Sequence, residues 1–365
     1  MGLTVAMIII FGIAAVIPAA WSIIGLIGGE KRYWPGVLGA AWAVALLLVT
    51  FIGAGKNWGD CPIDGGSAEG VITCATGDTA GCKPDVWALE CGQPPGGDCT
   101  TIPAGSSCPE GQRPVFVFCE KIQHGGVKQP WATWSDLSFI AAGLWLLWFF
   151  HYFGRPGRYG ETTMTADNPM IVTGWLSVVY GMIVIFMGPP SQWFHASMKD
   201  LGGWFDSMSV VIWLMFNGVY VTYNLLFAMW GNGRETARTI TVLVAWVVLV
   251  AIFGIIAVNP DARLYGYFAS GGLWGVAEVI YVFVAAYHKD VAYRRTWWLF
   301  VINIFVLAVT MTIWVFFNDE VVSPTACQGR EGFPGHAVFH ILASFSTVLT
   351  FMSFASEQRV NRSDE

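Results

Sequence analysis

Long apolar stretches constrain this 365-residue chain more than any other feature of its sequence. A helix that crosses a bilayer needs about 20 mainly apolar residues. Stretches of that kind occur near residues 3–28, 34–55, 132–153, 169–190, 203–230, 238–258, 267–288, 295–317 and 334–355. With 55% hydrophobic and only 12% charged residues, the chain is too apolar for a soluble domain. The sequence therefore predicts an all-α, multi-pass membrane protein. The first stretch lacks a basic n-region and is expected to be a retained span, with a cleaved signal peptide as the alternative.

The cysteines mark a segment of a different kind. Seven of the eight lie between Asn57 and Pro130, in a stretch rich in Gly, Pro and Thr, and the eighth is Cys327. They lack the paired CxxC spacing of a zinc ribbon, and their density favours disulfides formed in an oxidising compartment. Because seven is odd, one of these cysteines must pair with Cys327 if every cysteine is bridged. That pairing would place segments 57–130 and 318–335 on the same side of the membrane.

Basic residues are distributed unequally between the two sides of the membrane. The connections on one side contain Lys31, Arg32, Arg155, Arg158, Arg234, Arg238, Lys289, Arg294, Arg295, Arg359 and Arg362. The short loops on the other side contain Lys199, Arg263 and Arg330. Since Lys and Arg accumulate in cytoplasmic loops, the N-terminus is expected outside and the C-terminus inside. The cysteine-rich segment then lies outside, where disulfides form. No basic stripe of the kind that binds nucleic acid is present.

Five polar residues fall at the outer ends of the expected spans, namely Ser191, His195, Asp206, His336 and His340. His336 and His340 are four residues apart, so on a helix their side chains share one face. His195 supplies a third nitrogen. Three neutral imidazoles with an open fourth position are typical of catalytic zinc, which lowers the pKa of its bound water to about 7. The pattern predicts a zinc site near the outer face of the membrane.

Asp206 and Ser191 each have a chemical role in such a site and a simpler role outside it. Asp206 is suited to hold or deprotonate the zinc-bound water, or else it only caps its helix. Ser191 is suited to donate a hydrogen bond to an oxyanion, or else it is a turn residue that follows two prolines.

Two further carboxylates are candidates for supporting roles around the metal. Glu278 lies within an apolar span, where an ionisable residue is a functional candidate by default; alternatively, it bonds a neighbouring Tyr or Asn303. Asp136, in the motif WSDLSF at the start of the third span, either supports a metal ligand or marks the start of a helix, and the second interpretation is favoured.

These motifs together resemble a known superfamily of membrane proteins. Ser-x3-His at 191–195, an Asp eleven residues later and a late His-x3-His at 336–340 are similar to the pattern shared by alkaline ceramidases, adiponectin-type receptors and Per1-like lipid-remodelling proteins. The segment CEKIQ at 119–123, followed by QPWATWSDLSF, resembles the entry to the first core helix of alkaline ceramidases. The resemblance implies a disulfide between Cys119 and Cys327. Calcium binding, which this superfamily's ceramidases show around the Cys-Glu motif, is doubtful here because only Glu120 matches and Ile122 replaces the expected Asn.

The resemblance covers roughly residues 115–360 and implies a seven-helix hydrolase core (131–356). The apolar and cysteine patterns place two N-terminal helices (1–56) and the cysteine-rich outer loop (57–130) before this core, without a counterpart in the superfamily, and a cytoplasmic tail (357–365) after it. The outer loop is a candidate surface for a protein partner. His195, His336 and His340 would bind zinc, with Asp206 on the water and Ser191 on the oxyanion.

The implied activity is hydrolysis of a lipid amide such as ceramide, which would enter sideways from the bilayer. Two alternatives remain open: a Per1-type hydrolase that cleaves lipid esters, and a receptor or sensor in which zinc is structural. A retinal protein is disfavoured because no Lys lies within an expected span to form a Schiff base.

Overall fold

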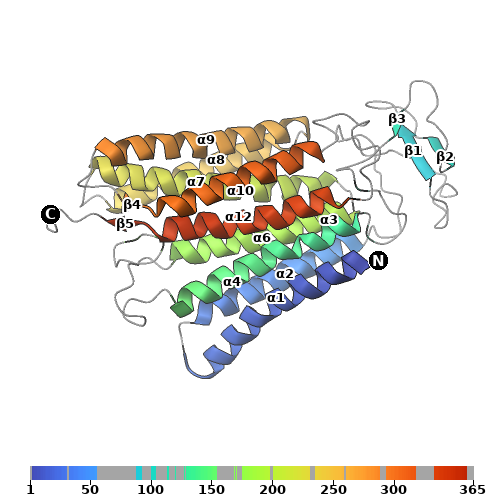
Figure 1. Ribbon diagram of the computed structural model, residues 1–365, viewed down its shortest axis with the longest axis horizontal. Coiled ribbons are helices and arrows are strands. Elements are labelled where there is room, and N and C mark those ends of the chain that lie inside the picture. The colour runs from blue at the N-terminus through green and yellow to red at the C-terminus, as the bar shows by residue number, and fades with distance from the viewer. Residues whose placement is uncertain are drawn as a thin grey trace.

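The computed structural model describes residues 2–30, 33–55, 88–92, 100–103, 113–114, 120, 127, 129–153, 168, 170, 175–197, 200–230, 235–258, 260–287, 293–317 and 333–359. Helices occupy each of the expected apolar stretches and run side by side along the long axis of the molecule (Figure 1). They are α1 (Gly2–Ile27), α2 (Trp34–Gly55), α3 (Pro130–Ser135), α4 (Leu137–Phe153), α6 (Trp175–Ser197), α7 (Asp200–Trp230), α8 (Glu235–Ile256), α9 (Pro260–Tyr287), α10 (Trp297–Phe316) and α12 (Gly335–Ala355).

Seven helical spans within the described residues are long and apolar enough to cross a membrane. They are formed by α1, α2, α3 with α4, α7, α9, α10 and α12. The apolar part of α8 is shorter, running from Ile240 to Ile256. The polar segment Ser191–Ser197 within α6 lowers the mean hydropathy of that helix. The chain is therefore a multi-pass membrane protein.

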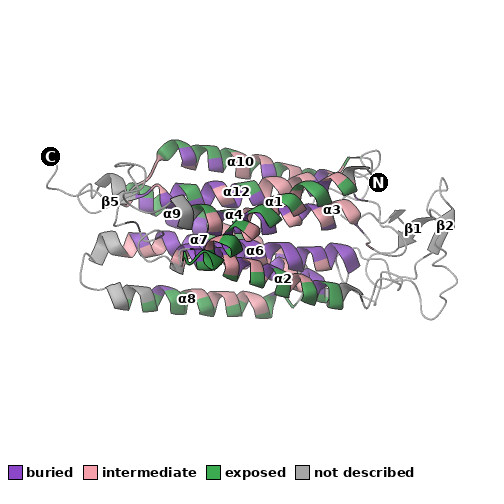
Figure 2. Ribbon diagram, turned by 90° about the horizontal axis from the view of Figure 1, so that it is seen from below, coloured by how far each residue is buried: buried purple, intermediate pink, exposed green. Residues whose placement is uncertain are grey.

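Burial divides the helices into an inner and an outer set. Buried residues, shown in purple, are concentrated on α6, whereas α8 and α10 carry many exposed residues (Figure 2). α6 packs against α4, α7 and α2, and α10 packs against α12. Large apolar side chains such as Ile24, Val247 and Phe305 point outward from the outer helices. These surfaces suit the hydrocarbon core of a bilayer, where backbone polar groups must bond within helices.

The third expected span is broken at Asp136. α3 ends there, and α4 begins with Leu137. Asp136 is the C-cap of α3, and its carbonyl accepts a hydrogen bond from the Phe139 amide at 3.1 Å. The interruption separates a six-residue helix from the rest of the span, and this short helix contributes to the candidate site.

The fourth expected span continues beyond its predicted end at residue 190. Pro189 and Pro190 lie inside α6, which extends to Ser197. Proline removes a backbone donor, here the ones that would bond the carbonyls of Ile185 and Phe186, and membrane helices tolerate such a loss inside a packed bundle. Thr50 of α2 donates a hydrogen bond to a different carbonyl, that of Pro189, at 3.0 Å and so links α2 to α6. Ser191 and His195 consequently lie on a helix and not in a turn.

Short strands accompany the helices. β1 (Ala88–Gly92) pairs antiparallel with β2 (Thr100–Pro103) and with β3 (Arg113–Pro114) inside the cysteine-rich segment. β4 (Tyr293–Arg294) pairs with β5 (Gln358–Arg359) at the opposite end of the bundle (Figure 1). Cys119 and Cys327 lie outside the described residues, so their predicted disulfide remains a prediction.

Candidate metal centre

His195, His336 and His340 form one buried cluster. Each can offer one ring nitrogen, and these nitrogens lie within 4.8 Å of one another. The ring centroid of His195 lies 5.0 Å from that of His336 and 5.1 Å from that of His340. The ring centroids of His336 and His340 are 4.5 Å apart. At most 4% of each residue is exposed. The three imidazoles can therefore contact a single ion.

Helix ends bring the three histidines together. α12 begins at Gly335, so His336 lies in its first turn and His340 one turn later on the same face. His195 lies in the last turn of α6. Both α12 and α6 pack against α3, which lies at the end of the bundle where α1 begins (Figure 1).

The start of α7 approaches the end of α6 very closely. A Cβ atom on Gly202 would lie only 2.9 Å from the Cα atom of Phe194, the neighbour of His195. This contact requires the absence of a side chain at position 202. It places Asp206, one turn further along α7, near the cluster.

The Nδ1 atom of His340 is surrounded by oxygen atoms. The Ser135 hydroxyl lies at 2.9 Å, the Oδ1 atom of Asp136 at 3.0 Å and the Ala132 carbonyl at 3.3 Å. The Ser135 hydroxyl already donates to the Ala132 carbonyl at 2.7 Å. Because Nδ1 faces a carboxylate and a carbonyl, it carries the proton, and the Nε2 lone pair is available to a metal. A carboxylate behind a ligand histidine is the usual support for a metal-bound imidazole.

Gln129 has the corresponding relation to His195. Its Oε1 atom lies 2.6 Å from Nδ1 of His195, and its backbone amide donates to the His195 carbonyl at 3.0 Å. An amide oxygen only accepts hydrogen bonds, so Nδ1 of His195 is the donor and Nε2 is the nitrogen available to a metal. Gln129 directly precedes α3, and Ser135 is the last residue of α3. This helix and the residue before it therefore contact His195 and His340.

Glu120 holds the first turn of α3. Its two carboxylate oxygens accept hydrogen bonds from the backbone amides of Trp131 at 2.7 Å and Ala132 at 2.9 Å. Burial raises the pKa of Glu120 to about 7, and the two amide bonds oppose this shift. The Gln129 side chain makes no capping bond to the helix, so Glu120 caps α3 from outside it.

The structure places Ser191, Asp206 and Asp136 around the histidine cluster. The Ser191 hydroxyl lies next to the Asp136 carboxylate. Close packing of α6 on α3 explains this contact, since a Cβ atom on Gly188 would lie 2.8 Å from the Asp136 carbonyl. The Asp206 carboxylate is near enough to His340 to interact electrostatically, and Asp206 is half-buried whereas Asp136 is fully buried. Asp206 is thus the more accessible of these two acidic groups.

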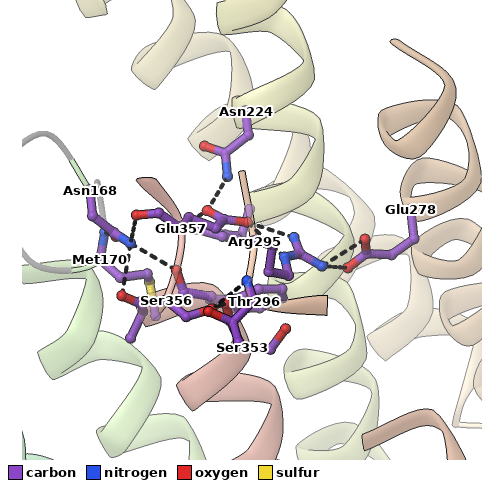
Figure 3. A network of polar contacts seen from close by, with 12 residues as sticks. Asn168, Met170, Asn224, Glu278, Arg295, Thr296, Ser353, Ser356 and Glu357 are labelled. Atoms are coloured by element: carbon purple, nitrogen blue, oxygen red, sulfur yellow. Dashed lines mark hydrogen bonds and ion pairs between the residues drawn. The ribbon is translucent and has the colours of Figure 1, made fainter. Parts of the chain in front are cut away.

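Glu278 is not part of this cluster. Both of its oxygens accept hydrogen bonds from Nη1 of Arg295 at 2.9 Å (Figure 3). Trp274 also donates to one of them, at 3.2 Å. Asn303, considered above as its partner, instead bonds Thr350 and Ser346.

Arg295 also bonds Glu357, which follows α12, with Nη2 at 2.6 Å and Nε at 3.0 Å from its Oε1 (Figure 3). His336 and Glu357 lie at opposite ends of the 21-residue α12, about 30 Å apart at 1.5 Å per residue. The predicted supporting role for Glu278 at the metal therefore has no geometric basis.

Sequence reasoning missed Gln129 and Ser135. Both are polar residues beside an apolar span, and such residues commonly cap or start helices. Their relation to the histidines depends on the break at Asp136, which the continuous apolar pattern of 132–153 conceals. The motif WSDLSF draws attention to Asp136 but does not identify the residues that precede it.

The donor set fits a transition-metal ion such as zinc. Imidazole nitrogens suit zinc, and protein sites with three histidines leave a fourth position open. Buried acceptors behind His195 and His340 hold each ring in the tautomer that binds a metal. No protein-family model, curated protein or solved structure matches the chain.

Proposed function

We propose that the chain is a zinc-dependent hydrolase that cleaves a lipid amide within the membrane. The observation that carries this proposal is the buried cluster of His195, His336 and His340 at one end of an apolar helical bundle. Three neutral imidazoles are the ligand set of catalytic zinc, and carboxylates are absent from the group of ligating atoms. A ceramide-like substrate is the proposed class.

When bound, zinc would make a water molecule nucleophilic at neutral pH. Asp206 would accept a proton from that water. The nearness of its carboxylate to His340 and its partial exposure support this role. The proposed role of Asp206 is therefore that of a general base.

Ser191 is proposed to donate a hydrogen bond to the carbonyl oxygen as negative charge develops on it. Its hydroxyl lies beside Asp136, one turn before His195 on α6. That hydroxyl would turn from the side of the Asp136 carboxylate toward the substrate carbonyl. An alternative role for Ser191 is to orient Asp136 behind His340.

The surroundings of the site suit a lipid substrate. The outer helices present apolar side chains to the bilayer, and the histidines lie near the ends of their helices. An acyl chain can remain in the bilayer while its amide reaches the level of the cluster. The proposed orientation puts the N-terminus outside and the C-terminus in the cytoplasm, with the site near the extracytoplasmic face.

The two N-terminal helices are proposed as additions to a seven-helix catalytic core. α1 packs against α3 and α4, and α2 packs against α6. Thr50 bonds the carbonyl of Pro189, two residues before Ser191. Such contacts would support the core beside the site.

The direct test is an assay of fatty-acid release by the purified protein, with ceramide and a glycerolipid ester as substrates. Zinc would be measured in the same samples. We expect release from ceramide by the parent, retained zinc with lost turnover in Asp206→Asn, and loss of both in His340→Ala. His151→Ala, in the last turn of α4, is the matched control and should behave as the parent.

Two results would redirect the proposal. Release from the ester alone would favour a lipid-remodelling esterase. Bound zinc with no release from either lipid would favour a receptor or sensor with a structural metal.

A further inference from the structure

The short helix α3 depends on a residue outside it. α3 has six residues, and helices of that length are unstable by themselves in water. Pro130 occupies its first turn and supplies no backbone donor. The next two amides, of Trp131 and Ala132, both bond Glu120, which is eleven and twelve residues away in the chain. Glu120 thus determines where the first turn of α3 lies.

α3 and the residues that flank it hold two of the three histidines. Gln129 bonds His195 through both its side chain and its backbone. At the other end of α3, Ser135 and Asp136 contact Nδ1 of His340 at 2.9 Å and 3.0 Å. A displacement of α3 would move all of these contacts together, because a six-residue helix moves as one body.

We infer that Glu120 is a positioning residue for the metal centre and acts through α3. This inference rests on the metal centre proposed above, but it does not depend on which bond the protein cleaves. Glu120 touches none of the histidines by hydrogen bond; it fixes the helix whose residues orient them. The connection between α2 and α3, which contains Glu120, is thereby linked to the strength of metal binding.

The expected loss of zinc affinity can be judged from other metal sites in which a residue that hydrogen-bonds a metal ligand is replaced. Loss of such a group commonly weakens metal binding 10–100-fold. Glu120→Gln keeps one acceptor oxygen but replaces the other with an amide NH2 group. This group is a donor and would face a backbone N–H, which is also a donor. Glu120→Asp shortens the side chain, so it cannot reach both amides. We expect each variant to weaken zinc binding about 10-fold or more.

The experiment measures zinc affinity by competition with a chelator in the full-length protein, together with the thermal unfolding of the metal-free form. Gln129→Leu removes the acceptor behind His195 and should also weaken binding. In the double variant of Glu120→Gln and Gln129→Leu, the loss should be clearly smaller than the product of the two single losses, because both act through α3. Cobalt bound in place of zinc should show an altered visible spectrum in each variant.

Thr133→Val is the matched control. Thr133 lies in α3 and is 3% exposed, and its hydroxyl makes no hydrogen bond to the described residues. The zinc affinity of the Thr133→Val variant should equal that of the parent.

Three outcomes would overturn the inference. Unchanged zinc affinity in Glu120→Gln and Glu120→Asp, with only a lower unfolding temperature, would make Glu120 a structural cap. Losses that multiply in the double variant would mean that Glu120 does not act through α3. Stoichiometric calcium in the parent that is lost in Glu120→Gln would mean that Glu120 holds an ion and not the helix. Absence of zinc from the parent would instead refute the metal centre itself. Absence of hydrolysis in the parent, with altered zinc affinity in the Glu120 variants, would refute only the enzymatic proposal.

Discussion

The Oδ1 atom of Asp136 lies 3.0 Å from Nδ1 of His340, and both side chains are buried. This contact fixes the proton on Nδ1 and directs Nε2 toward the other two histidines. Asp136 therefore has a role that depends on His340, which is 204 positions later in the chain. The pair connects the break between α3 and α4 to the first turns of α12.

Replacement of Asp136 should weaken zinc binding. Asp136→Leu removes the acceptor behind His340, and a loss of about 10–100-fold in zinc affinity is expected. Asp136→Asn retains one oxygen acceptor and should lose less. Chelator competition on the purified variants checks the order. Ser138→Ala is the control, since Ser138 is also buried and its hydroxyl makes no hydrogen bond to the described residues. Equal affinity in the parent and Asp136→Leu would contradict the assigned role.

The contribution of Glu120 to stability should depend on pH. Its pKa is raised to about 7 in the folded chain from 4.5. The folded state thus binds the proton more tightly, and the stabilising effect is fully present below about pH 4.5 and is lost as the pH rises through about 7. Among the described residues, the charged and titratable groups that act on the pKa of Glu120 are His340 and Asp136, and their effects are smaller than that of burial.

The measurement is the unfolding free energy of the metal-free parent and of Glu120→Gln between pH 5 and pH 8. The parent should lose up to about 3 kcal/mol relative to the variant as the pH rises. Parallel pH profiles would show that Glu120 does not titrate in this range.

Removal of Arg295 should destabilise the end of the bundle opposite the histidines. Arg295→Met leaves Glu278 and Glu357 buried without their cation, which typically costs about 3–5 kcal/mol of unfolding free energy. Tyr220 and Asn224 still donate to Oε2 of Glu357, which limits the loss at that residue.

Denaturant unfolding in detergent checks this prediction, with zinc content as a second measurement. Zinc should be retained, because the network lies at the other end of α12 from His336. Adding Glu278→Gln to Arg295→Met should recover part of the stability. An unchanged unfolding free energy in Arg295→Met would contradict the structure.

A side chain at position 202 should disturb the contact between α6 and α7. Gly202→Ala places a Cβ atom 2.9 Å from Cα of Phe194, and backbone atoms cannot yield as a flexible side chain does. The expected loss is about 1–3 kcal/mol in unfolding free energy. Gly271→Ala in α9 is the control, because a Cβ atom there would meet no atom within 4 Å other than those of its chain neighbours and the adjacent backbone of its own helix. The control should be neutral or slightly stabilising, and a similar loss in both variants would contradict the packing.

The apolar pattern predicts the helices well because a membrane leaves the backbone few alternatives to a helix. The same pattern does not reveal local interruptions. The break at Asp136 and the continuation of α6 through Pro189 leave no mark in that pattern. Composition likewise gives no indication of strand pairing between residues 88 and 114.

The histidines of the site could be predicted because their spacing on α12 and their level in the membrane are properties of the sequence. The groups behind them could not. Gln129 and Ser135 are ordinary polar residues until α3 folds against the histidines. Glu278 is the opposite case. An intramembrane carboxylate is easily noticed in a sequence, but an ion pair with Arg295, and not the metal site, explains why Glu278 is buried.

X-ray absorption at the zinc edge would show whether His195, His336 and His340 bind one zinc ion. We expect about one zinc per chain, with three nitrogen neighbours at about 2.0–2.1 Å and one oxygen neighbour. These nitrogen neighbours should be lost in His340→Ala. Sulfur neighbours at about 2.3 Å, which would indicate cysteine ligands, or a purified parent without zinc, would contradict this expectation.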